Sequence, residues 1–168
     1  LDLQVNGAVG IDLAVNPAGL WDVAAALPQF GVTAFLPTLV TCSPQTIGKA
    51  REVIAAGPPL GWVGAVPLGW HFEEPMINAA YAGAHARRHI RTPSLEFVRS
   101  WSTPTVAMVT IAPELPGMGP VIRTLRGRGV VVAAGHTAAT ADDARAAAAA
   151  GVGMVTHLFN AMAPVHHR

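Results

Sequence analysis

The sequence contains very little cysteine and very little charge. Its 168 residues include a single cysteine, Cys42, which excludes an internal disulfide and any zinc cluster built on several thiolates. Charged residues make up 12% of the chain. That is about half of the share of roughly 25% that is usual in globular domains. A chain of this kind buries much of its surface, or it has lost a partner that covered the surface.

Two further absences exclude classes of partner. The formal net charge is +1, which gives no electrostatic reason to expect binding to nucleic acid or to a membrane surface. The sequence has no uncharged apolar run of about 18 residues, so we expect no transmembrane helix. It also lacks the pattern of a signal peptide. We therefore expect no nucleic acid and no membrane as partners, and a cytoplasmic location.

Both ends of the sequence are abrupt. The chain opens inside a strand-like run, Leu1–Gly7, without a methionine, and its last residues are His166-His167-Arg168 with no helix or tail after them. We therefore expect the sequence to be a fragment of a longer protein.

Apolar runs rich in β-formers alternate with helical stretches along the whole chain. Several of these runs are nearly continuous, which is typical of parallel strands covered on both faces. The six predicted strands are Leu1–Asn6, Thr33–Leu39, Trp62–Phe72, Val106–Ala112, Val130–Ala134 and Met154–Leu158. The five predicted helices are Ala18–Phe30, Pro44–Ala56, Ser94–Ser100, Pro120–Arg128 and Ala139–Ala150. Ser43 and Thr140 are expected N-caps, and the alternation predicts an α/β domain.

Polar side chains mark the C-terminal ends of most of these strands. An open doubly wound sheet and a barrel both fit the alternation, but no G-x-G-x-x-G turn follows a strand. Strand-end residues build the active sites of (β/α)₈ barrels. We therefore predict that residues 1–168 form a TIM-like barrel that is incomplete, with about six β/α units. The strand-end residues are Gln4, Asn6, Thr38, His71, Glu73, Glu114, His136, His157 and Asn160.

Three of these side chains favour a metal site. Glu73 offers a carboxylate, while His136 and His157 offer imidazole nitrogens from neighbouring strand ends. One carboxylate and two histidines with an open position form a known catalytic zinc arrangement. Any one histidine alone is more often a hydrogen-bonded core residue. The set taken together favours a metal-dependent hydrolase.

Gln4 and Asn6 stand two residues apart at the end of the first strand. Many barrel-type metal hydrolases have a His-x-His pair at this place, and amides are poor ligands for zinc. We expect both side chains to line the pocket or orient water, beside one metal ion rather than two. The alternative is that Asn6-Gly7 is simply a turn.

The order of several short motifs resembles one family from end to end. The motifs resemble those of the N-acetylglucosamine-6-phosphate deacetylases, in the amidohydrolase superfamily. They are Asp2–Gly7, Gly31–Thr38, Gly69–Pro75, Gly83-Ala84-His85, Ile111-Ala112-Pro113-Glu114, Gly135-His136-Thr137 and Thr156–Met162 leading into His166-His167-Arg168.

The resemblance implies an activity and a set of site residues. It implies hydrolysis of the acetamide of N-acetylglucosamine 6-phosphate to glucosamine 6-phosphate and acetate, in a homo-oligomer (dimer or tetramer). It implies one divalent ion on Glu73, His136 and His157, with zinc favoured over iron or another divalent ion. His85 is the implied catalytic donor to the substrate carbonyl, and His71 is implied to be structural rather than a ligand. The implied substrate contacts are Ala84, His85, Asn160, Ala161 and Arg168, with Arg168 suited to the phosphate.

Two features depart from the family pattern. Glu74 stands where the family usually has glycine. The family's catalytic aspartate and its small β-domain lie outside residues 1–168, and Asp142 and Asp143 open a helix and do not replace that aspartate. Two alternatives therefore stay open at this point. One is another amidohydrolase, such as a cyclic-amide hydrolase or a deaminase, and the other is a non-catalytic sugar-phosphate-binding chain.

Overall fold

The computed structural model describes residues 1–73, 75–101 and 104–165. Glu74, His166, His167 and Arg168 lie outside the described residues, so the expectations about them stay predictions.

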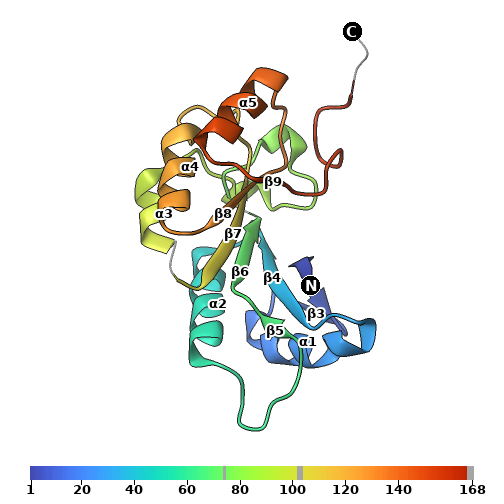
Figure 1. Cartoon of the computed structure of the whole chain (residues 1–168). Coiled ribbons are helices and arrows are strands. Elements are labelled where there is room, and N and C mark those ends of the chain that lie inside the picture. The colour runs from blue at the N-terminus through green and yellow to red at the C-terminus, as the bar shows by residue number, and fades with distance from the viewer. Residues whose placement is uncertain (74, 102–103, 166–168) are drawn as a thin grey trace.

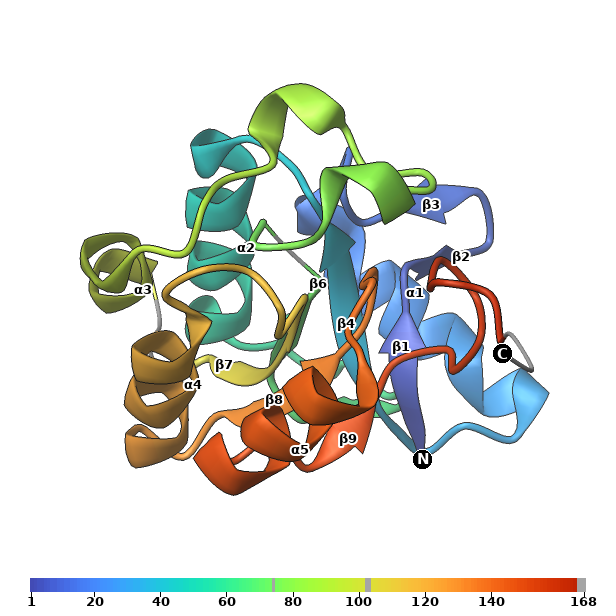
Figure 2. The same ribbon diagram turned by 90° about the horizontal axis from the view of Figure 1, so that it is seen from above.

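A parallel sheet that curls on itself forms the centre of the fold (Figures 1 and 2). Its strands follow one another in chain order, as the alternation of the sequence predicts. They are β1 (Asp2–Val5), β4 (Ala34–Val40), β6 (Trp70–Glu73), β7 (Val106–Ile111), β8 (Val131–Ala134) and β9 (Met154–Val155). The six strand positions agree with the predicted six units.

Two predicted strands are shorter than expected. The run Trp62–Phe72 holds only β5 (Val66–Pro67) and β6, which pair in turn with the start and the end of β4. Gly69 interrupts them with a φ of 120°, in the left-handed region that other residues avoid. The last strand ends at Val155 instead of Leu158, because the chain turns sharply at His157. A short hairpin of β2 (Gly7–Ala8) and β3 (Ile11–Asp12) was not predicted.

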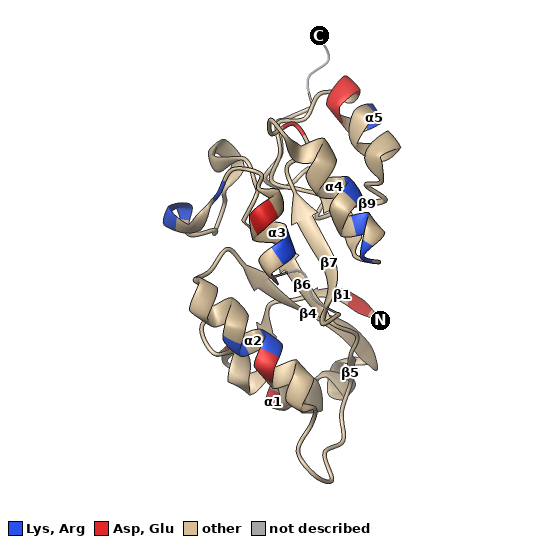
Figure 3. Cartoon of the chain, turned by 90° about the vertical axis from the view of Figure 1, so that its left-hand side faces the viewer, with Lys and Arg blue, Asp and Glu red and all other residues tan. Residues whose placement is uncertain are grey.

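Helices cover the outer side of the sheet (Figure 2), and most charged residues belong to helices or loops (Figure 3). The predicted helix Ala18–Phe30 is shorter than expected: α1 covers only Leu20–Ala26, a 3₁₀ turn precedes it, and a second 3₁₀ turn with Pro28 in its first turn follows it. The N-caps at Ser43 and Thr140 are confirmed, each accepting a hydrogen bond from the backbone N–H three residues on. No helix in the described part of the chain has the length and apolarity needed to cross a bilayer. The helices are α1 (Leu20–Ala26), α2 (Pro44–Ala56), α3 (Leu95–Trp101), α4 (Met118–Gly127) and α5 (Ala141–Ala150), and the 3₁₀ turns are η1 (Pro17–Gly19), η2 (Leu27–Phe30), η3 (Ala79–Tyr81) and η4 (Arg87–His89).

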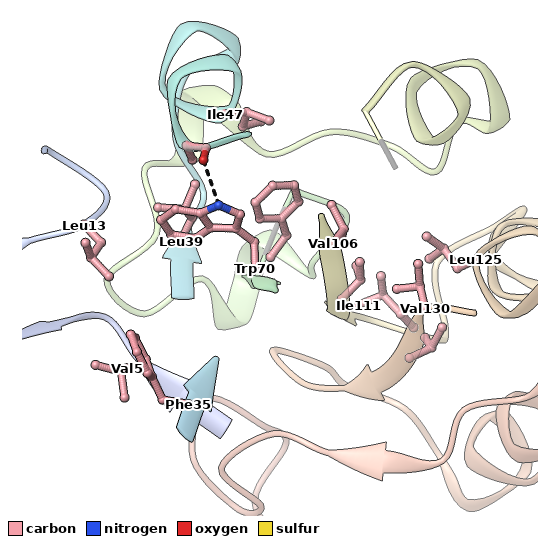
Figure 4. Packing of buried hydrophobic residues seen from close by; sticks show 14 of the residues in the cluster. Val5, Leu13, Phe35, Leu39, Ile47, Trp70, Val106, Ile111, Leu125 and Val130 are labelled. Carbon is pink, nitrogen blue, oxygen red and sulfur yellow. Dashed lines mark hydrogen bonds between the residues drawn. The ribbon is translucent and has the colours of Figure 1, made fainter. Parts of the chain in front are cut away.

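The main hydrophobic core fills the space between the sheet and the helices (Figure 4). Trp70 and Phe72 of β6 point into it and are fully buried. The indole N–H of Trp70 donates a 2.9 Å hydrogen bond to the carbonyl of Ala50, which ties β6 to α2. Because side chains alternate along a strand, His71 and Glu73 point to the opposite, inner side of the sheet.

The inner side of the sheet is layered from apolar to polar toward the C-terminal ends of the strands. A small apolar cluster around Leu36, Met108 and Ala133 lies lowest. Above it the buried Thr38, His71 and Thr110 face one another through hydrogen bonds. The polar side chains at the strand ends lie above these residues. The sheet therefore brings to one edge the residues that the sequence predicted as a site.

Candidate metal centre

Three predicted ligands meet at the C-terminal ends of three strands. Glu73 is the last residue of β6, while His136 and His157 each stand two residues past β8 and β9. Oε1 of Glu73 lies 3.0 Å from Nε2 of His136 and 2.7 Å from Nε2 of His157. The two Nε2 atoms are 3.0 Å apart. One carboxylate oxygen and two imidazole nitrogens thus form a nearly equilateral triangle.

The hydrogen bonds of the two imidazoles show which nitrogens carry protons. Nδ1 of His136 lies 2.7 Å from the carbonyl of Tyr81, and Nδ1 of His157 lies 3.1 Å from the carbonyl of Asn160. A carbonyl can only accept, so each Nδ1 carries the hydrogen, and Nε2 of each ring faces Glu73. This arrangement, with a backbone carbonyl on the outer nitrogen, is how proteins orient metal-bound histidines.

The triangle fits a bound cation. When both imidazoles are neutral, three acceptor atoms at these separations repel one another unless positive charge lies between them. One proton can bridge only one pair of atoms, whereas a metal ion can serve all three. Ligand atoms at about 2.0–2.1 Å from a tetrahedral zinc ion lie roughly 3.3 Å apart, close to the spacing seen here.

The charges of Glu73 and His136 support each other. Burial disfavours the ionised form of Glu73, but the hydrogen bond and the charges of the neighbouring histidines hold its pKa below the usual range. Burial likewise disfavours the charged form of His136, while hydrogen bonds to Glu73 and to the Tyr81 carbonyl raise its pKa above the ordinary value. The carboxylate therefore stays ionised at neutral pH, as a ligand must.

Gln4 holds the second oxygen of the Glu73 carboxylate. Its side-chain N–H donates a 2.7 Å hydrogen bond to Oε2, the oxygen that faces away from the histidines. Both oxygens of this buried carboxylate thus have partners, and Oε1 is left for the triangle. Sequence reasoning placed Gln4 beside the site, but not in contact with Glu73.

His85 lies near the triangle of ligand atoms, but the ring nitrogen that is free to face it, Nε2, carries a hydrogen. One of its ring nitrogens lies within 4.8 Å of ligand atoms of Glu73 and His136. However, the backbone N–H of Thr41 donates to Nδ1 of His85 at 3.1 Å, which requires a lone pair on that nitrogen. Burial, together with nearby His136, lowers the pKa of His85 to about 4, so the ring is neutral and its proton sits on Nε2. For this reason the geometry favours His157 over His85 as the third candidate ligand, beside Glu73 and His136.

A cavity of about 360 Å³ opens over the triangle. The predicted residues Asn6, Ala84 and His85 line it together with the ligands. Asp12 of β3 also lines it, although no motif or spacing in the chain indicates this residue. A larger cavity of about 490 Å³ near α5 and β9 is lined almost entirely by apolar side chains, and none of Glu73, His85, His136 and His157 lines it.

The predicted substrate residues Asn160 and Ala161 contact the site through their backbone carbonyls. The carbonyl of Asn160 accepts from His157, and the carbonyl of Ala161 accepts a 3.2 Å hydrogen bond from the N–H of Thr137. The side chain of Asn160 is exposed. The structure therefore brings Asn160 and Ala161 beside the ligands, while Arg168 lies outside the described residues.

A buried chain of hydrogen bonds lies directly beneath the ligands. The hydroxyl of Thr110 lies 2.7 Å from Nε2 of His71 and 2.7 Å from the hydroxyl of Thr156. Nδ1 of His71 lies 3.2 Å from the carbonyl of Leu3. Burial lowers the pKa of His71 to about 4, so its ring is neutral, with the hydrogen on Nδ1. His71 thus has a structural place, as the resemblance implies.

Known proteins that are similar to the chain are deacetylases of amino-sugar phosphates. No family model matches the chain. The chain is 37% identical over 179 residues to the human N-acetylglucosamine-6-phosphate deacetylase, covering all of this chain and 43% of the relative. It is 34% identical over 172 residues to the N-acetylgalactosamine-6-phosphate deacetylase of Escherichia coli O157:H7, covering 46% of that protein.

A solved structure agrees with these relatives. A mutant N-acetyl-D-glucosamine-6-phosphate deacetylase from Mycobacterium smegmatis, in complex with N-acetyl-D-glucosamine-6-phosphate, matches with a TM-score of 0.88 at 34% identity. The match covers all of this chain and 44% of that one. By sequence and by fold, the chain is similar over its whole length to the N-acetylglucosamine-6-phosphate deacetylases, and it spans a little less than half of the length of these relatives.

Proposed function

We propose that the protein hydrolyses the acetamide group of N-acetylglucosamine 6-phosphate, releasing glucosamine 6-phosphate and acetate. The observation that carries this proposal is the triangle of acceptor atoms from Glu73, His136 and His157, which suits a divalent cation at the floor of a cavity. The likeness to deacetylases of amino-sugar phosphates supplies the substrate class.

Glu73, His136 and His157 would hold one divalent ion, with zinc favoured by the ligand set of one carboxylate and two imidazoles. A bound ion of this kind makes water nucleophilic at neutral pH and polarises a carbonyl oxygen. Gln4 would fix the carboxylate of Glu73 by its hydrogen bond to Oε2. Because amides stand where other barrel-type metal hydrolases have a His-x-His pair, the site would hold one ion rather than two.

His85 would act on the acetyl carbonyl. Because Thr41 occupies Nδ1, the Nε2–H of the neutral ring is the available donor, and a donor at that place stabilises negative charge that develops on the carbonyl oxygen. The proton that moves from water to the leaving amine requires a base. The resemblance assigns that base to an aspartate beyond residue 168.

The remaining parts of the proposal concern the ends of the substrate and the assembly. Ala84, Asn160 and Ala161 would contact the sugar, and Arg168 would bind the phosphate through charge-assisted hydrogen bonds. We also propose a cytoplasmic homo-oligomer. The likeness to an N-acetylgalactosamine-6-phosphate deacetylase makes the C4 epimer the second substrate to test.

The test uses the full-length protein with and without a chelator. Acetate release is measured from both 6-phosphorylated N-acetylhexosamines and from unphosphorylated N-acetylglucosamine, and bound metal is measured by elemental analysis. We expect about one ion per chain, loss of the ion and of turnover in His136→Ala, and little change in His89→Ala. Turnover that survives complete removal of metal would contradict the proposal.

A further inference from the structure

Glu114 lies just past the end of β7, between the strands that carry the ligands. Strands β6 and β8 flank β7, and each contributes a ligand at its end, but β7 contributes none. The half-buried carboxylate of Glu114 does not line the cavity over the ligands. It accepts three hydrogen bonds instead. The donors are the side-chain N–H of Asn78 at 2.9 Å, the backbone N–H of Ala138 at 2.7 Å and the hydroxyl of Thr137.

Two of these donors directly follow His136 in the chain. His136 has a φ of 48°, in the left-handed region that costs energy for a side chain other than glycine. Such a conformation persists only where the surroundings hold it. By binding the hydroxyl of Thr137 and the N–H of Ala138, Glu114 fixes the backbone on the C-terminal side of this strained residue.

The third donor, Asn78, belongs to the turn that orients the ring of His136. Asn78 donates its backbone N–H to the carbonyl of His136 at 2.9 Å, and its own carbonyl accepts from the N–H of Tyr81 at 2.9 Å. The carbonyl of Tyr81 in turn accepts from Nδ1 of His136. Through Asn78, Glu114 therefore also holds the turn that orients the imidazole.

The same contacts continue toward the second imidazole. Thr137 donates its backbone N–H to the carbonyl of Ala161 at 3.2 Å and accepts from the N–H of Ala163 at 3.1 Å. These bonds hold the segment that contains Asn160, whose carbonyl accepts from Nδ1 of His157. One carboxylate thus connects the supports of both histidines.

We propose that Glu114 is a positioning residue of the metal centre, which aims Nε2 of His136, and less directly Nε2 of His157, at Oε1 of Glu73. The inference rests on the proposed function, because it assumes that these atoms bind a divalent ion. Groups that orient metal ligands from outside typically change metal affinity by about 10–100-fold when they are removed. We expect an effect of that size from losing the carboxylate.

The experiment compares a loss with a conservative change in the full-length protein. Glu114→Ala removes all three acceptor contacts, whereas Glu114→Gln keeps a carbonyl oxygen for Asn78 and Ala138. The matched control is Glu96→Ala, the same change at an exposed position of α3. The zinc dissociation constant is measured by competition with a chromophoric chelator. The increase of the melting temperature on adding zinc is measured alongside it.

We expect Glu114→Ala to bind zinc at least tenfold more weakly and to show a smaller increase of melting temperature with zinc. Glu114→Gln should bind within about threefold of the wild type, because it keeps the acceptor at Oε1, and Glu96→Ala should match the wild type. A purely structural role would lower the melting temperature with and without zinc alike. Zinc binding by Glu114→Ala within twofold of the wild type would overturn the proposal.

If Glu114→Ala does not fold, Thr137→Val and Thr137→Ser give the same test, because only serine keeps the hydroxyl that Glu114 binds. Weaker zinc binding in the valine variant alone supports the positioning role, and equal binding in both refutes it. A wild-type protein that binds zinc and releases acetate, with unaffected variants, refutes the role of Glu114 only. A wild-type protein that binds no divalent ion refutes the proposed function and this inference with it.

Discussion

Substitution of Thr110 tests whether the buried chain of hydrogen bonds beneath the candidate ligands stabilises the sheet. The side chain is fully buried, and its hydroxyl contacts both Nε2 of His71 and the hydroxyl of Thr156. Since Nδ1 of His71 donates to Leu3, Nε2 must accept, so Thr110 donates to His71 and accepts from Thr156. Thr110→Val keeps the shape of the side chain and removes both bonds.

The expected cost follows from the groups left without a partner. A buried polar group that loses its hydrogen bond costs about 1–3 kcal/mol. His71 cannot find another donor without moving, while the hydroxyl of Thr156 can rotate, so we expect Thr110→Val to lower the free energy of unfolding by about 2–4 kcal/mol. Thr110→Ser keeps the hydroxyl and loses one methyl group, which should cost only about 0.5–1.5 kcal/mol.

Denaturant unfolding of the full-length protein, followed by circular dichroism in the presence of a chelator, measures the two variants without a contribution from metal. The relative stability of the two variants decides the outcome. The valine variant keeps more apolar surface, so it should be less stable than the serine variant only if the hydroxyl stabilises the fold. If Thr110→Val is as stable as Thr110→Ser, the hydroxyl does not carry the stabilisation and the direction assigned to the chain is wrong.

Two further predictions concern the neighbours of the ligands. Because burial lowers the pKa of His71 from 6.5 to about 4, the unfolded chain binds more protons than the folded chain between these values, and stability should fall as the pH decreases through that window. At pH 5 this proton binding by the unfolded chain should lower the free energy of unfolding by roughly 2 kcal/mol relative to neutral pH. The difference in the free energy of unfolding between about pH 7.5 and pH 5 should therefore be smaller in His71→Asn than in the wild type. An unchanged difference would contradict the assignment. Gln4→Leu leaves Oε2 of the buried Glu73 without its donor, so its zinc affinity should fall by about 10–100-fold, whereas Asn6→Ala, at an exposed position, should change it by less than about threefold. Isothermal titration with zinc distinguishes these two variants, and equal affinities would show that the amide does not orient the carboxylate.

The general architecture was predictable because it depends on local patterns. The helix Pro44–Ala56 has the predicted bounds, since Ser43 caps its start and Gly57 ends it. The gathering of Glu73, His136 and His157 followed from their places at the ends of parallel strands. These features need only the periodicity of the chain and the rule that strand ends meet at one edge of a sheet.

The finer parts of the site were not predictable because they depend on distances between segments far apart in the chain. The contact of Gln4 with Glu73 joins residues 69 positions apart. The proton positions on His85 and His136 are set by a backbone N–H and a carbonyl, which no side-chain pattern indicates. The short final strand likewise reflects the left-handed backbone of His157, which the apolar run Met154–Leu158 does not reveal.

The order of the strands gives the metal centre a place in the assembly of the protein. Each strand of the curled sheet pairs with the one that precedes it, so the sheet can grow in the direction in which the chain is synthesised. If the sheet grows in this order, Glu73 and His136 would be in place before β9 joins, and His157 would be the last of the three to arrive. A slip of β6 by one residue would turn Glu73 toward the helices. Capture of the ion would therefore come after the sixth strand has docked in register, and would lock the completed arrangement.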